Sequence, residues 1–518
     1  IGIDFGIHAV NRYREERVRD HDIDESMRLT AEQIGVAFFI VMVTSAIGFL
    51  SNMVSAFPPI RDFGFTAAVG IVFTFLIFGV FLPAGKVWVD RLRERYPIPT
   101  VTDTPLGSES SPLGRLLSGG VVIAERAPVA FVVLLLLSTA GTSAYAAGVD
   151  TGFSPDDFLP AEETPDYLQA LPEPFRPPAE FEYVKDTNFI DENFAEDGQV
   201  LMFVEGPMRR DSALDGLHRA GADPPSTFRG EDRRAESQSI VSVVRRRAER
   251  DPSFRRLVRR NDVDGDGIPD DDLPRIYDAL SEGPGGSGVG QFLSADRRSA
   301  LVIYTVDGDA SDEAITADAR GVAERFRYDA TPTGNAVIFD EAIALVFESV
   351  IESLLITLVG ASMFLVAVYW ALNGRPSLGV VNAVPIAITV VVVVASMRAF
   401  GIKFNAINGT ILAITIGLGI DYSVHIVHRF ADEFDDRDLE EALQRTVIGT
   451  GGALTGSMLT TVFGVGVIAL ALNPALGVFG VLTAMSVFYA YVASVFVLPS
   501  FLVLWARLID GDRTTPPG

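Results

Sequence analysis

Long uncharged apolar runs set the strongest limit on how this chain can fold. A helix needs roughly 20 apolar residues to cross the hydrocarbon core of a bilayer. Eight runs are long enough, at 34–56, 60–85, 119–147, 346–372, 377–400, 404–428, 446–472 and 474–506. Residues 1–11 have the composition of the end of a ninth run. The chain is 48% hydrophobic and also 21% charged, which is typical of a multi-pass membrane protein with a sizeable soluble part.

The apolar runs at the two ends of the chain repeat one another. IGIDFGIHAVNRY (1–13) and GLGIDYSVHIVHRF (417–430) align at an offset of 417, and later pairs such as Thr44 with Thr460 align at 416. One extra residue in a connecting loop explains the change. The repeat predicts two equivalent helical bundles related by a pseudo-twofold axis. The second copy is nearly whole and the first keeps only its last part, so we expect an N-terminally truncated chain.

The distribution of Lys and Arg predicts which side of the membrane each loop faces, because cytoplasmic loops are enriched in them. Basic residues follow the first motif, the run at 60–85 and the second motif, which puts 148–345 outside the cell. The predicted domains are the end of the first bundle (1–92), a cytoplasmic linker (93–118), transmembrane helix 7 (119–147), an extracytoplasmic domain (148–345), transmembrane helices 8–12 (346–510) and a cytoplasmic tail (511–518).

The extracytoplasmic segment is predicted to be an α+β domain. GQVLMFVEG (198–206) and ALVIYTVDG (300–308) have the β-branched and aromatic residues of strands. SDEAITADARGVAERF (311–326) has helical spacing, with Ser311 as its N-cap. A further strand then leads into the next span, and this order favours a small sheet with helices on one face.

The repeated motif puts an ionisable side chain inside an apolar span. A charged Asp at the centre of a membrane helix costs about 2.5–3.5 kcal/mol on insertion scales, and neutralisation removes that cost. We therefore interpret Asp421 and its equivalent Asp4 as groups that gain and lose a proton. His425 and His8 lie one helical turn further on, on the same face, and extend the path toward the cytoplasm. The alternative is an Asp that only fixes helix packing through a hydrogen bond.

Other residues around the motif support a relay. Glycines before each Asp predict that the two helices approach closely and bring the two carboxylates together at the pseudo-symmetry axis. Polar residues in the following span of each repeat could complete the path, although a Thr within the membrane more often bonds its own backbone. These residues are Thr44, Ser45, Thr460 and Thr461.

These features resemble the resistance-nodulation-division superfamily. GLGIDYSVHIVHRF is similar to its mycobacterial-membrane-protein-large (MMPL) branch, which has hopanoid- and lipid-exporting relatives. The resemblance implies a polytopic α-helical fold of pseudo-twofold repeated six-helix bundles, the first incomplete here, with an extracytoplasmic, porter-like α+β domain. It also implies that Asp421, Tyr422 and Asp4 match the proton-relay Asp-Tyr pairs. Phe5 lacks the hydroxyl, so the relay would be asymmetric or would use His8 or water.

The function predicted from these features is the export of lipids or other amphiphiles, driven by the proton gradient, with membrane lipids as partners. A sterol- or lipid-sensing receptor and an ion-driven accessory to protein translocation are the alternatives. The sequence contains no phosphate-binding Gly loop, nucleophile elbow or zinc-ligand spacing. We therefore expect no enzyme activity, no required cofactor and no nucleic-acid partner. Sodium coupling and a homo-oligomeric state stay open.

A second candidate site lies in NDVDGDGIPDDDL (261–273). The pattern is that of a calcium loop, in which oxygen ligands recur at alternate positions around a Gly turn. The candidate ligands are Asp262, Asp264, Asp266 and Asp270. Leu273 stands where a bidentate Glu is expected, and Asp271 or Asp272 could replace it. A solvated acidic loop that binds no ion is the alternative.

The net charge of −25, with Lys only at 86, 185 and 403, predicts a prokaryote of high-salt habitat, and we expect a halophilic archaeon. The chain has no cysteine, so disulfides and thiolate chemistry are excluded. An Arg-rich segment at 229–260 interrupts the acidic character. We interpret it as a solvated helix face balanced by nearby Asp and Glu, with binding to anionic lipid head groups as the alternative.

Overall fold

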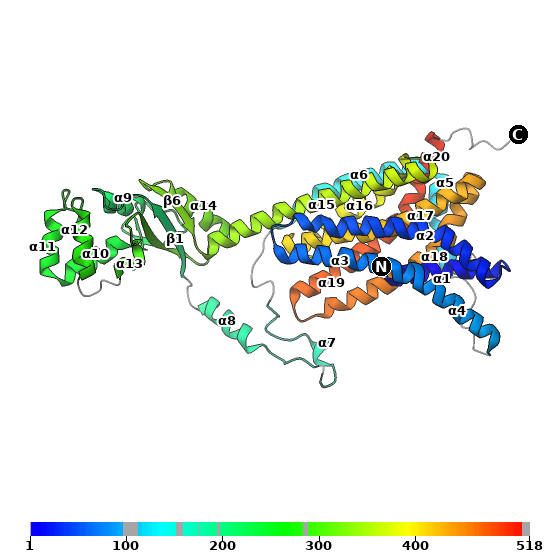
Figure 1. Ribbon diagram of the computed structural model, residues 1–518, viewed down its shortest axis with the longest axis horizontal. Coiled ribbons are helices and arrows are strands. Elements are labelled where there is room, and N and C mark those ends of the chain that lie inside the picture. Colours follow the sequence, from blue (N-terminus) through cyan, green and yellow to red (C-terminus); the bar gives the residue numbers. More distant parts are fainter. Residues whose placement is uncertain are drawn as a thin grey trace. The chain divides into compact units, whose positions relative to one another are not determined.

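The computed structural model describes residues 2–96, 112–151, 159–174, 176–193, 197–282 and 288–509. The chain divides into two compact units, Ile1–Pro177 with Leu345–Gly518 and, between them in sequence, Pro178–Ala344. Within the described residues, eight helices are long and apolar enough to cross a membrane. This confirms the prediction of a polytopic helical protein. The first unit is a helical bundle and the second contains a β-sheet (Figure 1).

The helices that build the first unit follow the predicted apolar runs. In chain order they are α1 (Gly2–Val18), α2 (Ile23–Leu50), α3 (Pro58–Leu76), α4 (Leu82–Arg95), α5 (Pro112–Arg126), α6 (Pro128–Ala146), the short α7 (Asp166–Gln169), α15 (Asn335–Asn373), α16 (Ser377–Ala399), α17 (Ala406–Asp436), α18 (Leu439–Gly466), α19 (Pro474–Val492) and α20 (Leu498–Ile509).

The two sequence repeats fold into the same series of elements. Helices α2, α3 and α4 correspond to α18, α19 and α20 at an offset of 416 in their starting residues. A 3₁₀ turn ends α2 at Ser51–Val54 and another ends α18 at Val467–Leu470. A π-helical turn follows α3 at Ile77–Phe81 and α19 at Ala493–Val497. Because even these irregular turns recur, the predicted duplication is confirmed in the fold.

The apolar run at 119–147 forms two helices instead of one. Ala127 separates α5 from α6 with a φ of −149° and a ψ of 53°. Pro128 follows it in the first turn of α6, where its missing N–H costs nothing. Helix α5 already begins at Pro112, within the range predicted as a linker, and α4 extends to Arg95. Residues 97–111 of that linker and the predicted tail lie outside the described residues.

Helix α17 lies at the centre of the first unit. It packs against α2, α16, α18 and α19, and 94% of its apolar window is buried, compared with 11% for the helix at Pro58–Arg95. Close approach to α2 depends on two glycines, since a Cβ built on Gly48 would lie 3.1 Å from the Cα of Gly417. Ser45 stabilises the same crossing, because its hydroxyl donates a hydrogen bond to the carbonyl of Gly417 at 3.2 Å.

The outer helices of this unit expose large apolar side chains. Phe65 and Phe73 on α3 are 56% and 59% exposed, and Leu134 and Leu137 on α6 are 67% and 68% exposed. Soluble proteins rarely expose apolar patches as large as these to water. Lipid covers them in a bilayer at no cost, which agrees with the multi-pass arrangement.

The second unit combines one four-stranded sheet with short helices. Its elements are α8 (Glu182–Asn193), β1 (Asp197–Glu205), α9 (Ala213–Ala220), β2 (Gly230–Glu231), β3 (Arg234–Ala235), β4 (Ser237–Gln238), α10 (Ile240–Arg250), α11 (Pro252–Arg260), α12 (Leu273–Glu282), α13 (Val289–Phe292), β5 (Ser299–Asp307), α14 (Asp312–Ala323) and β6 (Asp329–Thr333). The strand order is β4-β5-β1-β6, and β1 is antiparallel to both β5 and β6. Strands β5 and β6 are therefore parallel to each other and are connected by α14 across the intervening β1.

One face of this sheet is buried and the other is not. Val200, Met202 and Val204 of β1 have no exposed surface, whereas Phe203 on the opposite face is 41% exposed. Alternate residues of β5, including Val302 and Tyr304, join the same core, which the helices of the unit complete. The two predicted strands, the predicted helix and its N-cap Ser311, which accepts a hydrogen bond from the backbone N–H of Ala314, are confirmed.

We expect the exchange of Gly48 for Leu to destabilise the helical unit. The new side chain would meet the backbone of α17, which cannot move aside, and overpacking of this kind costs about 1–3 kcal/mol. Thermal unfolding of the protein in detergent measures the loss. Gly35→Leu is the matched control, since no atom lies within 4 Å of a Cβ at that position on the same helix. Equal destabilisation by the two variants would contradict the close crossing of α2 and α17.

Candidate functional site

The two acidic residues of the repeated motif lie inside the helical unit. Asp4 on α1 and Asp421 on α17 are each 5% exposed. Each motif helix packs on the span that follows the other motif, α1 on α18 and α17 on α2. The two acids are therefore surrounded by residues of both repeats, and neither faces bulk solvent.

Hydroxyl groups hold Asp4. Ser457 and Thr461, one turn apart on α18, both donate hydrogen bonds to its Oδ1, the latter at 3.3 Å. The hydroxyl of Tyr422 lies 3.4 Å from that of Ser457. The Tyr of the second motif is thus connected to the Asp of the first through a single serine.

Asp421 has different surroundings. Its Oδ1 lies 3.1 Å from Nε2 of His425, an ion-pair distance. The two atoms are not aligned as a hydrogen bond, and neither has another hydrogen-bond partner among the described residues. Phe5, the equivalent of Tyr422, is fully buried and stacks on Phe38 at 4.3 Å between ring centroids. One acid is therefore held by hydroxyls, and the other faces an imidazole.

The two histidines of the motif meet face to face. Their rings stack with centroids 4.0 Å apart and planes only 9° apart, and His8 and His425 are 6% and 5% exposed. The sequence places each His one turn from its own Asp, but the contact between the two rings arises only when the two repeats assemble around α2 and α18. The stack therefore joins the two repeats through one side chain from each.

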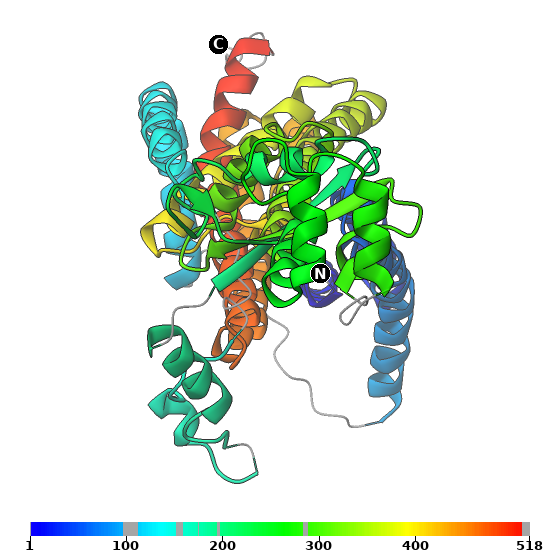
Figure 2. The same cartoon turned by 90° about the vertical axis from the view of Figure 1, so that its left-hand side faces the viewer.

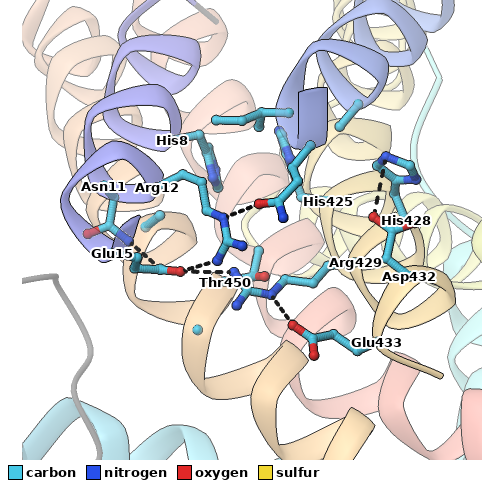
Figure 3. Close-up of a pocket in the computed structure, with 15 residues that line it drawn as sticks. His8, Asn11, Arg12, Glu15, His425, His428, Arg429, Asp432, Glu433 and Thr450 are labelled. Atoms are coloured by element: carbon cyan, nitrogen blue, oxygen red, sulfur yellow. Dashed lines mark hydrogen bonds and ion pairs between the residues drawn. The ribbon is translucent and has the colours of Figure 1, made fainter. Parts of the chain in front are cut away.

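A cavity of about 90 Å³ adjoins the histidine pair. Residues of α1, α2, α17 and α18 line it, and Figure 3 shows His8, His425, His428 and Thr450 among them. Nδ1 of His428 and Oγ1 of Thr450 are buried without a protein partner among the described residues. Polar walls and a volume of this size suit about three water molecules at 30 Å³ each.

A network of ion pairs, one of which joins the two repeats, surrounds the far end of this cavity (Figure 3). Arg429 of α17 lies 3.3 Å from Glu15 of α1 and 3.5 Å from Glu433 of its own helix. Arg12, the equivalent of Arg429, contacts Glu15 at 2.5 Å and Glu16 at 2.9 Å. The sequence analysis identified the matching arginines but did not predict this network. The sequence feature that indicates it is an acid four residues after each Arg.

Of the four predicted supporting residues, the structure brings only Thr461 to a motif acid. Thr44 bonds the carbonyls of its own helix, and so does Thr460. Ser45 bonds the backbone of α17 instead. Ser457 was missed, because it aligns with Val41 and so has no polar equivalent in the other repeat. The relay role of all these residues stays a prediction.

The Asp-rich loop of the second unit places its carboxylates close together. Oxygens of Asp262, Asp264 and Asp270 lie within 4.8 Å of one another. Asp266 groups instead with Asp264 and with Asp215 of α9. Burial raises the pKa of Asp266, and the charges of Asp264 and Asp262 add to that rise. Three of the four predicted ligands therefore converge and could hold a hard cation such as Ca²⁺.

The twelfth position of this loop offers no ligand. Leu273 begins α12 and is completely buried in the apolar core of the unit. Glycines at 265 and 267 have φ values of +81° and +85°, which is the backbone such a turn requires. Calcium binding by the loop stays a prediction.

Comparison with known proteins identifies related membrane proteins. The model of the MMPL family matches residues 1–93 and 235–516. The membrane protein MJ1562 of Methanocaldococcus jannaschii is 25% identical over 264 residues, which cover 49% of this chain and 65% of that protein. The apo-petrobactin exporter of Bacillus anthracis is 32% identical over 108 residues, 20% of this chain and 14% of the exporter. The hopanoid transporter HpnN of Rhodopseudomonas palustris is 29% identical over 98 residues, 19% of this chain and 11% of the transporter.

Solved structures share the fold of the whole chain. SecDF, a translocon-associated membrane protein of Thermus thermophilus, superimposes with a TM-score of 0.50 at 14% identity, over 98% of this chain and 53% of SecDF. SecDF in its super-membrane-facing form gives a TM-score of 0.52 at 12% identity, over 99% and 54%. At these identities the likeness shows the fold alone. The chain spans less than two thirds of the length of the relatives it matches.

We expect Ser457→Ala to destabilise the protein, because it removes a hydrogen bond to a buried carboxylate. The loss of one such partner costs about 1–3 kcal/mol, which unfolding in a denaturing detergent measures. Thr460→Ser is the control, since Thr460 bonds only its own helix and Ser keeps the hydroxyl. Wild-type stability of Ser457→Ala would show that this contact to Asp4 contributes nothing.

We expect Ca²⁺ to bind the Asp-rich loop weakly, with a Kd of about 10⁻⁴–10⁻³ M, because the loop lacks its twelfth-position carboxylate. Calorimetric titration of the full chain in detergent measures this affinity. The double variant Asp262→Asn/Asp264→Asn should abolish the signal, whereas Asp309→Asn, an exposed acid outside the loop, should leave it unchanged. An unchanged signal in the double variant would exclude the loop as the site.

Proposed function

Because this chain belongs to the MMPL family, we propose that it is a membrane transporter that exports hydrophobic or amphiphilic molecules and is driven by the proton gradient. Two relatives are named for exporting apo-petrobactin and for transporting hopanoids. Both matches cover a small share of this chain, so they support the class of activity and leave the substrate open. The apolar outer faces and the multi-pass arrangement fit such a role.

The observation that carries the proposal is the pair of buried acids connected across the two repeats. Asp4 reaches Tyr422 through Ser457, and Asp421 reaches His8 through His425. Each connection joins a group of one repeat to a group of the other. A proton bound at either acid therefore changes contacts between the repeats, which is the coupling that a transporter of alternating states needs.

The proton would travel between these groups and the polar cavity. Water in the cavity reaches the stacked imidazoles, and His425 passes the proton to or from Asp421 at 3.1 Å. Each elementary charge that crosses 100 mV releases about 2.3 kcal/mol, enough to bias two conformations by about 50-fold.

The ion pairs around Glu15 and Arg429 give this path a charged boundary. The pair of Arg429 with Glu15 joins α17 to α1, so separation of the two helices would open the cavity and break this pair. The Lys and Arg placement along the chain supports a cytoplasmic position for this end of the bundle. The same placement supports an external position for the sheet-containing unit.

The acidic surface supports a halophilic source.

Two other functions compete with export. The fold is shared with SecDF, and an ion-driven accessory to protein translocation would use the same buried acids. In that case the sheet-containing unit would bind unfolded polypeptide in preference to lipid. A lipid-sensing receptor would bind its ligand independently of the proton gradient. The exporters among the sequence relatives favour the transporter.

We expect Asp421→Asn to abolish proton flux across vesicles that contain the protein, because the amide cannot exchange a proton with His425. A pH-sensitive dye inside the vesicles measures the flux after an inward proton gradient is imposed. Asp24→Asn makes the same exchange on an exposed side chain of α2 and should retain wild-type flux. Undiminished flux in Asp421→Asn, in a protein that inserts and folds normally, would refute proton coupling at this site.

A further inference from the structure

The second unit carries a concentration of positive charge that the proposed proton path does not use. Helices α10 and α11 together span residues 240–260, which contain eight arginines and only two acids, Glu249 and Asp251. The segment therefore has a charge of +6, while the whole chain has −25. Figure 2 brings the end of the unit that contains these helices toward the viewer.

Packing of α11 against α12 decides where the arginines point. Phe254 and Val258 of α11 are buried in the apolar core, as are Ile276 and Leu280 of α12. Arg256 lies two positions after Phe254 and Arg260 two positions after Val258, so both arginines face outward from α11. Arg275 of α12 is exposed as well. Because the two helices lie side by side (Figure 1), their outward faces border a common groove.

This groove has a volume of about 440 Å³. Arg256 and Arg260 line it from α11, and Arg275 lines it from α12. Leu257 and Ala279, both partly buried against the core, form an apolar part of its wall.

The three arginines make no ion pair within 4.0 Å among the residues that the structure describes. Arg247 nearby, in contrast, pairs with Asp251 at 3.0 Å. Two acids also line the groove, and one of them, Asp278, is already paired with Arg297 at 2.5 Å. Glu282 is the other. The sequence predicted a helix face at 229–260 whose arginines are balanced by nearby acids. This prediction holds for Arg247 but not for Arg256 and Arg260.

We propose that this arginine groove binds the phosphate headgroup of an anionic amphiphile. The planar guanidinium offers two parallel N–H donors to phosphate oxygens, and three such groups around one hollow suit an anion that has several oxygens. The apolar wall at Leu257 and Ala279 suits the first carbons behind the headgroup. The choice of an amphiphile rests on the proposed function, whereas the choice of a phosphate group rests on the arginines alone.

Binding is tested on the full chain in nanodiscs of phosphatidylcholine, with no proton gradient. The probes are water-soluble dioctanoyl phosphatidylglycerol, dioctanoyl phosphatidylcholine and inorganic phosphate, each followed by calorimetric titration. We expect the anionic lipid to bind and Arg256→Gln/Arg260→Gln to weaken its binding at least tenfold, because charge-assisted hydrogen bonds are lost. The zwitterionic lipid should bind at least tenfold more weakly to the wild type.

Arg246→Gln/Arg259→Gln is the matched control, since it removes the same charge from exposed positions of α10 and α11 outside the groove. It should bind the anionic lipid as the wild type does, and both variants should unfold at the wild-type temperature. If both variants weakened lipid binding equally, the loss would reflect only the removal of positive charge from this region. That result would overturn the proposal that the groove is the binding site. Absence of binding to the wild type, or equal affinity for inorganic phosphate, would also overturn it.

Failure of this proposal is distinguishable from failure of the transport proposal. Asp421→Asn lies in the helical unit and should bind the anionic lipid normally even if it carries no protons. Conversely, Arg256→Gln/Arg260→Gln should conduct protons normally if the groove only holds a headgroup.

Discussion

The cost of keeping two carboxyl groups inside a membrane-spanning bundle governs the rest of this structure. Each group needs a partner, since an isolated charge in hydrocarbon is expensive. Hydroxyls of α18 meet that need for Asp4, and His425 meets it for Asp421. The crossing of α2 and α17 at Gly48 and Gly417 brings their backbones close together beside these acids. The same constraint concentrates polar groups and a small cavity in one region of an otherwise apolar interior.

Duplication produced two acids in equivalent positions, but their surroundings have diverged. Phe5 stands where the second motif has Tyr422, and Val41 stands where the second bundle has Ser457. As a result, Asp4 accepts hydrogen bonds from hydroxyl groups. Oδ1 of Asp421 instead faces an imidazole and accepts no hydrogen bond among the described residues. The two equivalent acids are therefore not interchangeable, because each contacts a different kind of side chain.

Charged side chains are used differently in the two units. An ion pair between Arg429 and Glu15 joins α17 to α1, whereas Arg256, Arg260 and Arg275 make no ion pair among the described residues and are exposed. The three arginines repel one another in this groove, because like charges placed together raise the electrostatic energy. Their arrangement is therefore better explained by an anionic ligand than by folding.

Periodicity and duplication in the sequence by themselves determined the spans, the repeated elements, the principal strands and the identity of the motif acids, because these depend on local hydrophobic pattern. Only the tertiary structure decided the stack of His8 on His425, the contact of Ser457 with Asp4, the break at Ala127 and the groove around Arg275. The stack, the contact with Asp4 and the groove join residues far apart in the chain, through side-chain directions that no local spacing specifies. The break depends on the backbone angles of one residue before a proline, which an uninterrupted apolar run does not reveal.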